Sequence, residues 1–150
     1  MQRKRYTTHP SNKSLQVPTW WLVDATNLIV GRMASQVAHL INGKHKATFA
    51  PHLNCGDKVV VINASKVRFT GKKASIKIYA KHTGYPGGFR TTTPKELLAK
   101  KPHAIVENAV RGMLPKNKLG RQKFKNLFVY PYSTHPHNAQ KPEKITFPHS

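Results

Sequence analysis

The chain has 150 residues, enough for one domain of ordinary size with a modest hydrophobic core. Its 26 Lys and Arg residues face five Asp and Glu residues, so the formal net charge is +21 and a compact fold repels itself unless a polyanion neutralises it. No apolar run approaches the roughly 20 residues that span a bilayer, and one cysteine excludes an internal disulfide. A nucleic acid is therefore the first partner to consider.

Residues 1–18 form a basic segment that contains Ser and Thr but no acid and no apolar core. The missing apolar core argues against a secretory signal. We expect a basic N-terminal arm that binds RNA. The alternative is a remnant of a mitochondrial targeting sequence, although Pro10 and Pro18 work against the amphipathic helix that such a sequence forms.

A change of hydrophobic period follows this segment. Residues 20–23 are a short apolar run that ends at Asp24 and predicts a buried strand. Apolar residues then recur at helical spacing over 33–41, and Gly43 supplies a stop signal. Residues 59–62 are continuously apolar and β-branched, as in a central strand covered on both faces. These elements predict a βαβ unit with parallel strands and a right-handed connection.

Two further stretches carry strand and loop signals. Alternating residues at 67–70 and 76–79 predict a β-hairpin around 71–73, with one apolar and one basic face. Residues 82–90 contain three glycines and a proline, which exclude a helix and predict a shaped loop.

The side chains of this loop suit RNA. Tyr85 and Phe89 offer flat faces, and His82 and Arg90 offer donors, a combination that fits phosphates, sugars and unstacked bases. The alternative is a plain Gly/Pro turn between two elements. The positive charge around the loop favours the RNA interpretation.

Two helices are expected after the loop. Residues 93–96 form a capping box with Pro at the first helical position. Pro102 begins the second helix, whose apolar face, including Met113, ends near Leu114.

The last third of the chain is dense in charge and then rich in proline. A basic segment at 116–125 precedes a final apolar run at 127–130. From 131 to 150, proline and histidine with few apolar residues predict an extended tail and not a packed element. We therefore expect a single α/β domain over residues 19–130 between two tails.

Short motifs in a fixed order are more specific than any of them alone. They are residues 21–25 (WLVDA), 30–34 (VGRMA), 43–46 (GKHK), 55–57 (CGD), 82–88 (HTGYPGG) and 112–117 (GMLPKN). The ordered set resembles the large-subunit ribosomal protein L-thirteen family over nearly the whole chain. The resemblance implies a three-layer α/β/α fold around a small, mainly parallel sheet, with extended basic N- and C-terminal tails.

The resemblance also implies a function. It is that of a structural constituent of the large ribosomal subunit that binds and stabilises folded large-subunit rRNA early in assembly, beside neighbouring ribosomal proteins and without forming a homo-oligomer. The motif variants are similar to mitochondrial members and some bacterial ones. We expect a mitochondrial ribosome in the matrix, with the bacterial cytoplasm as the alternative.

The candidate rRNA contacts are mostly cations, because Lys and Arg neutralise phosphates and release counterions. The cations are Lys44, Lys46, Lys72, Lys73, Lys77, Lys81, Arg90, Lys116, Lys118, Arg121, Lys123 and Lys125. His45, His82 and Tyr85 are candidates for base or sugar contacts. For each lysine the alternative is a solvated surface charge.

Enzyme and metal sites are weighed against this interpretation. Gly71 and Lys72 lack both the earlier glycine and the following Ser or Thr of a phosphate-binding loop. Cys55 has a histidine nearby in sequence, but a buried or loop cysteine is the favoured role, and the scattered histidines have no metal-ligand spacing. For Asp24 and Asp57 we favour ion pairing or capping over paired-carboxylate catalysis.

We therefore expect no catalytic residue, no metal and no cofactor. An RNA-binding regulator that acts away from the ribosome needs the same positive charge, so composition leaves that alternative open. An enzyme that acts on RNA is the third possibility.

Overall fold

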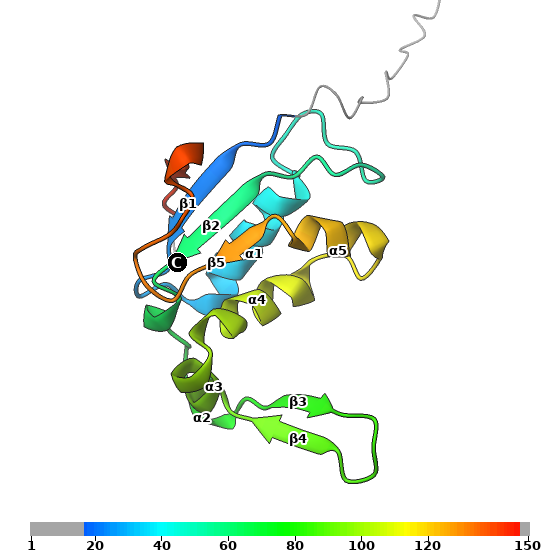
Figure 1. The fold of residues 1–150 in the computed structure, drawn as a ribbon, viewed down its shortest axis with the longest axis vertical. Helices are drawn as coiled ribbons and strands as arrows, with labels where there is room; N and C mark the ends of the chain where they lie inside the picture. Colours follow the sequence, from blue (N-terminus) through cyan, green and yellow to red (C-terminus); the bar gives the residue numbers. More distant parts are fainter. Residues whose placement is uncertain (1–16, 148–150) are drawn as a thin grey trace, which may run out of the picture.

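The computed structural model describes residues 17–147. A four-stranded sheet lies at its centre, with the strand order β5-β2-β1-β6, and each neighbouring pair is parallel (Figure 1). The strands are β1 (Trp20–Asp24), β2 (Lys58–Ile62), β5 (Leu127–Val129) and β6 (Glu143–Lys144). An α/β fold with a mainly parallel sheet is thus confirmed.

The β1–α1–β2 unit matches the sequence prediction. Helix α1 (Val30–Asn42) follows β1, and its buried stripe includes Met33 and Val37, which belong to the hydrophobic core. Figure 1 shows α1 behind the sheet. The helix ends at Gly43, which has a φ of +80°, and a Cβ built there would lie 2.8 Å from the Cys55 carbonyl carbon, so only glycine fits this turn.

Three helices lie in the second half of the chain. They are α3 (Pro94–Lys100), α4 (Pro102–Met113) and α5 (Lys118–Phe124). The predicted capping box begins α3, because the Glu96 N–H donates to Thr93 Oγ1 and the Thr93 N–H donates to Glu96 Oε2, each at 3.4 Å.

Helix α4 packs against α1 and completes the core on one face of the sheet. Ile105, Val106 and Val110 are fully buried there, as their helical spacing predicts. Met113, the last residue of the expected apolar face, is exposed, because it lines an open hollow between α1 and α4.

The opposite face of the sheet is covered by an aromatic cluster. Trp20 and Phe128 stack with their ring centroids 5.5 Å apart, and the His137 ring lies 4.6 Å from that of Phe128. Tyr130 Oη and His137 Nε2 are 2.9 Å apart. Val60 in β2 is fully buried, so the predicted coverage of this strand on both faces is confirmed. The third, helical layer stays a prediction.

The prediction of a hairpin from residues 67–70 and 76–79 is wrong. Residues 73–76 instead form the short helix α2 (Lys73–Ile76), in which the Lys77 N–H donates to the Lys73 carbonyl. The alternating pattern is too short to specify a strand when no neighbouring strand pairs with it.

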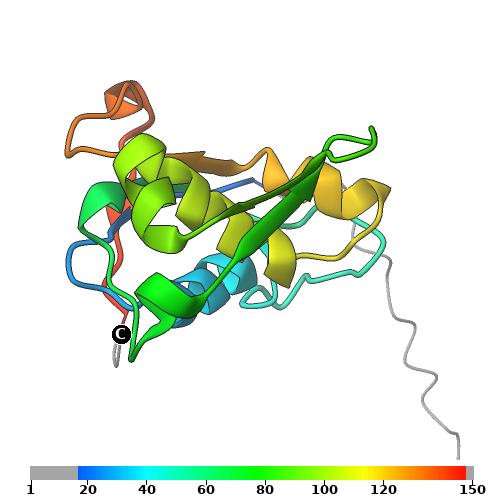
Figure 2. The ribbon, with the colours of Figure 1, turned by 90° about the horizontal axis from the view of Figure 1, so that it is seen from below.

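The hairpin lies farther along the chain, and its turn is the glycine-rich loop. It pairs β3 (Tyr79–His82) with β4 (Phe89–Thr92) in antiparallel register as a separate two-stranded sheet. Figure 1 shows both strands apart from the four-stranded sheet, and in Figure 2, seen from below, they cross in front of the helices.

The prediction of an unpacked tail from residue 131 onward is also wrong in part. The 3-10 helix at Asn138–Gln140 and strand β6 fold back over the domain, and the Ile145 N–H donates to the Leu22 carbonyl at 2.9 Å. Ile145 and Phe147 pack against the core. Parallel pairing with β1 compensates for the low apolar content of this segment.

The N-terminal arm predicted at residues 1–18 lies almost entirely outside the described residues. The domain limits at 19 and 130 stay predictions. Within the described part of the chain, none of the helices has the length and apolar character needed to cross a membrane.

Candidate nucleic-acid interface

The glycine-rich loop is closed by its own backbone. The Thr83 N–H donates to the Gly88 carbonyl at 3.1 Å, and the Gly88 N–H donates to the Tyr85 carbonyl at 2.9 Å. Gly84 and Gly87 have φ values of +90° and +71°, a region that favours glycine. In backbone terms the loop is therefore a Gly/Pro turn, and the hairpin that carries it projects away from the four-stranded sheet (Figure 1).

The hairpin presents cations and rings to solvent. Tyr85 is 76% exposed and Phe89 is 64% exposed, which is unusual for large rings. Lys81 and Arg90 stand opposite each other in the register, and both are exposed. His82 Nδ1 accepts from a backbone N–H of the loop at 2.9 Å, so Nε2 carries the proton of the neutral ring.

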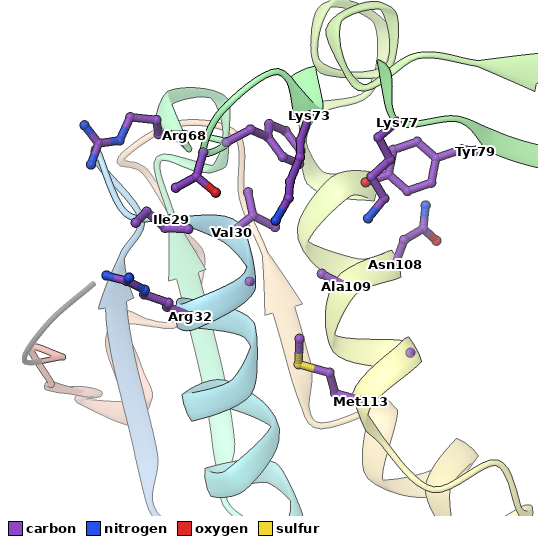
Figure 3. A pocket seen from close by; sticks show the side chains of 14 residues that line it. Ile29, Val30, Arg32, Arg68, Lys73, Lys77, Tyr79, Asn108, Ala109 and Met113 are labelled. Atoms are coloured by element: carbon purple, nitrogen blue, oxygen red, sulfur yellow. The ribbon is translucent and has the colours of Figure 1, made fainter. Parts of the chain in front are cut away.

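A hollow of about 630 Å³ opens where the first turn of α1 meets α4 and the segment around α2; we call it the α1–α4 pocket (Figure 3). Four cations line it: Arg32, Arg68, Lys73 and Lys77. Among the described residues that line it, none is acidic. Figure 3 shows Lys73 pointing toward the start of α1, whereas Lys77 lies on the α4 side.

Tyr79 lines the α1–α4 pocket beside α4. Burial raises the pKa of Tyr79 above its ordinary value, so its hydroxyl stays protonated and available as a donor. Lys77 Nζ lies 5.1 Å from the centroid of the Tyr79 ring. This geometry holds a positive charge against a π face.

A second hollow, of about 500 Å³, lies between the end of α4 and α5; we call it the α4–α5 pocket. It brings together the predicted contacts Lys116, Arg121 and Lys125. Arg111 joins them, and its guanidinium carbon lies 4.6 Å from the centroid of the Phe124 ring. The stacking fixes one cation in a group of four.

The basic residues after α1 are held by a buried acid. Asp57 is fully buried, and its Oδ1 accepts from Lys46 Nζ and, at 2.9 Å, from the Thr19 N–H. Its Oδ2 accepts from Trp21 Nε1 at 3.0 Å and lies 2.8 Å from His45 Nε2. The prediction that Asp57 forms a local ion pair is confirmed.

These contacts decide the charge of Asp57. Burial raises the pKa of Asp57, but the hydrogen bonds from Lys46, Trp21 and the Thr19 N–H, together with the charge of Lys46, outweigh burial and hold that pKa below its usual value. The Lys46 and His45 side chains are 19% and 28% exposed, and each makes one of its polar contacts with Asp57 inside the protein.

Lys123 differs from the other candidate contacts because it lies inside the protein. It is 1% exposed, its Nζ donates to Asn42 Oδ1 at 2.5 Å, and it lies 5.8 Å from the centroid of the Phe49 ring. Burial lowers the pKa of Lys123, with an opposing effect of Cys55. Its burial between α5 and the end of α1 argues against the predicted phosphate contact by Lys123, whereas Lys44 nearby is exposed.

Other members of the predicted set are exposed but lie outside the two pockets. Lys72 lines a smaller hollow next to α2, and Lys118 begins α5. The sequence analysis missed Arg32, Arg68 and Arg111, which complete the pockets. Arg32 lies within the motif at residues 30–34, at the start of α1, and this motif was the sequence signal that could have identified it.

Asp24 and Cys55 have structural roles. Asp24 Oδ1 accepts from the Thr26 N–H at 3.0 Å, Thr26 Oγ1 at 2.7 Å and Asn63 Nδ2 at 2.9 Å. It therefore holds the turn after β1 and is not the predicted helix cap, since Ile29 stands at the N-cap of α1. Cys55 is buried, and its Sγ accepts from the Ala50 N–H at 3.4 Å, which confirms a buried loop cysteine. Across residues 17–147, no three His, Cys, Asp or Glu side chains lie where they could hold a metal ion together.

Comparison with known proteins decides the family. A family model described as Ribosomal protein L13 matches residues 18–136, which include both pockets and the hairpin. The chain belongs to the ribosomal protein L13 family. Membership makes it a ribosomal protein and not an enzyme. The match ends before His137, so β6 lies beyond the part that the family model describes.

Three relatives named "Large ribosomal subunit protein uL13" show how closely this L13-family chain follows bacterial members. That of Beutenbergia cavernae is 51% identical over 140 residues, which are 93% of each chain. That of Geobacillus kaustophilus is 53% identical over 91% of this chain and 94% of its own length. That of Salinibacter ruber is 54% identical over 84% and 85%. These bacterial relatives support the bacterial alternative and give no support to the mitochondrial expectation.

Proposed function

We propose that this L13-family protein binds folded large-subunit rRNA as a structural constituent of a bacterial-type ribosome, without catalytic turnover. The observation that carries the proposal is the way the chain uses its few acids. Both ion pairs within the described residues end on Asp57, which is buried. Exposed cations such as Lys81, Arg90 and Lys116 take part in neither of these pairs and are therefore available to an external polyanion.

Ten of the exposed cations stand on three surfaces that the fold holds in place. The hairpin supplies Lys81 and Arg90, and the two pockets hold four cations each. Helix α4 packs against α1 and contributes to both pockets, so their spacing is fixed by the core. A rigid array of this kind fits one folded RNA better than a flexible tail does.

The proposed contacts follow from exposure. They are Lys44, Lys72, Lys73, Lys77, Lys81, Arg90, Lys116, Lys118, Arg121 and Lys125 from the sequence analysis, with Arg32, Arg68 and Arg111 added from the structure. His82 and Tyr85 supply sugar or base contacts, and His45 does so through the edge that Asp57 leaves exposed. Lys123 is not included because its ammonium is buried.

The proposal also covers the stage of ribosome assembly and the cellular compartment. The protein enters the large subunit early, beside other ribosomal proteins, and works in the cytoplasm of a bacterium. Its role in assembly is to neutralise phosphates where RNA segments converge, which lowers the repulsion between them. The bacterial relatives support this setting.

Ultraviolet cross-linking in native bacterial lysate tests the proposal, with sequencing of the attached RNA and sedimentation at low and high salt. Exposed contacts to about 6–10 phosphates weaken free binding about a thousandfold over a modest rise in salt, whereas a protein locked into a particle stays bound. We expect large-subunit rRNA in a heavy, salt-resistant particle. Messenger RNA in a light, salt-labile fraction would favour a free regulator and overturn the proposal.

A further inference from the structure

We propose that the α1–α4 pocket takes one unstacked nucleotide of the bound RNA, with its phosphate at the start of α1 and its base against α4. This inference rests on the proposed function and names the form of RNA that this part of the surface recognises. It separates the α1–α4 pocket from the exposed cations Lys81 and Arg90 of the hairpin.

The size of the pocket suits a single nucleotide. Its volume of about 630 Å³ lies within the range of about 300–1,000 Å³ that is usual for small-molecule sites. A duplex presents a convex backbone that touches only the rim of such a hollow, and its stacked bases cannot enter. Unstacked bases of loops and bulges can enter, and proteins read RNA sequence mainly there.

One half of the pocket carries the positive charge that suits a phosphate. Arg32 and Arg68 lie on the outer side of the first turn of α1, and Lys73 points toward the same turn from α2 (Figure 3). The N-terminus of this 13-residue helix adds a positive dipole in the same direction. Lys73 lies between the start of α1 and the α4 side, whereas Arg32 and Arg68 extend over the far side of that turn (Figure 3). Lys73 and the helix start therefore hold the phosphate, and the two arginines add positive charge at the rim of the pocket.

The other half has the chemistry that a base requires. Tyr79 offers a ring face for stacking, and Met113 forms an apolar wall on α4 (Figure 3). The side-chain amide of Asn108 lies beside Tyr79 and can both donate and accept, as the edge of a base does. A pocket for free phosphate alone needs neither a ring nor an amide.

Gly112 keeps the base side of the pocket open. A Cβ built on Gly112 meets no atom within 4 Å, so a larger side chain enters the hollow without clashing with the protein. Gly112→Leu therefore fills the pocket without changing its charge, and the helix tolerates the change because Leu has a higher helix propensity than Gly. Ala99→Leu on exposed α3 is a control of similar size outside the pocket.

The test uses the full-length protein and a transcript of bacterial large-subunit rRNA at fixed salt. We expect Gly112→Leu to weaken binding about tenfold with an unchanged salt dependence, and Ala99→Leu to bind within about twofold of the original protein. Asn108→Leu, which removes the amide at similar volume, should also weaken binding. Lys73→Ala should lower the slope of log K against log salt by about 0.7–0.9.

Cross-linking at 254 nm with peptide mapping supplies a direct readout. A base joined to Tyr79 or Met113 in the original protein, and lost in Gly112→Leu, supports the proposal. If Lys73→Ala weakens binding but Gly112→Leu and Asn108→Leu do not, the pocket proposal fails and rRNA binding stands. If the original protein does not bind the transcript, both fail. Binding of inorganic phosphate or nucleoside monophosphates at Arg32 without a base cross-link would reduce the site to a phosphate contact and also overturn the proposal.

Discussion

Asp57 Oδ2 lies 2.8 Å from His45 Nε2, although Asp57 begins the approach to β2 and His45 belongs to the turn after α1. The same carboxylate accepts from Trp21 Nε1 in β1 and from Lys46 Nζ. One of the five acids of the chain thus joins two strands and a helix end. In a protein this basic, that acid stabilises the fold through buried contacts and not through pairs with the exposed cations.

Replacing Asp57 by Asn should lower the free energy of unfolding by about 1–3 kcal/mol, because the buried donors that face it lose a charged acceptor. Urea denaturation at pH 7 measures the loss. Asp24→Asn is the matched control, since Asp24 is exposed and accepts from Thr26 and Asn63 at the surface. Equal losses in the two variants would contradict a special role for the buried carboxylate.

Stability at low pH should also depend on Asp57. Its folded-state pKa is lowered, so its contribution is fully present above the unfolded pKa of about 3.9 and is lost as the pH falls through the folded pKa. We expect the free energy of unfolding to fall below about pH 4 in the original protein and to fall less steeply in Asp57→Asn. Parallel curves for the two proteins would show that other carboxylates dominate.

His137 should make stability depend on pH near neutrality. Burial lowers the pKa of His137, with smaller effects of His135 and Lys58, so the folded state takes up a proton less readily than the unfolded chain. Stability is full above the unfolded pKa of about 6.5 and falls as the pH drops toward the folded pKa. Unfolding curves between pH 5 and 8, followed by tryptophan fluorescence, measure the slope.

Two variants separate burial from hydrogen bonding in this effect. His137→Gln removes the titrating group and should flatten the slope. Tyr130→Phe removes the partner 2.9 Å from His137 Nε2 but keeps the ring in place, so the slope should persist. A slope that survives His137→Gln would assign it to another group.

Lys123→Met tests whether a buried lysine contributes to RNA binding. Met fills a similar volume without the desolvation cost of the ammonium, and the lost hydrogen bond to Asn42 offsets that gain, so stability should change by less than about 1.5 kcal/mol. The salt dependence of rRNA binding should stay the same. Lys125→Met, at an exposed position in the α4–α5 pocket, should lower its slope by about 0.7–0.9. A similar loss in Lys123→Met would show that its ammonium reaches RNA.

Gly87→Val should disturb the hairpin turn while leaving the core intact. Gly87 has a φ of +71°, and a β-branched residue there costs about 1–2 kcal/mol in local strain, although a Cβ at this position meets no protein atom within 4 Å. Amide hydrogen exchange should be faster in residues 79–92 and unchanged in β2. Gly87→Asn is the control, because Asn tolerates this region of φ. Unchanged exchange in Gly87→Val would mean that the turn relaxes without strain.

Helices α1, α3 and α4 and the inner strands β1 and β2 were predictable because their signals are local, whereas α2 and α5 were not predicted. The apolar stripe of α1, the capping box at Thr93 and the continuous apolar run of β2 each lie within a few turns of chain. The hairpin was misplaced because the alternation at residues 76–79 is equally local but has no partner strand, and pairing is a long-range property.

The sequence by itself determined that this protein is an α/β domain with an excess of positive charge, since composition and hydrophobic period do not depend on the chain's path. Tertiary structure alone decided which cations act together. It buried Lys123, paired Lys46 with Asp57, and brought Arg32 and Arg68 to Lys73 at one hollow. The physical reason is that the effect of a charge depends on its exposure and its neighbours, and both arise only when segments distant in sequence pack together.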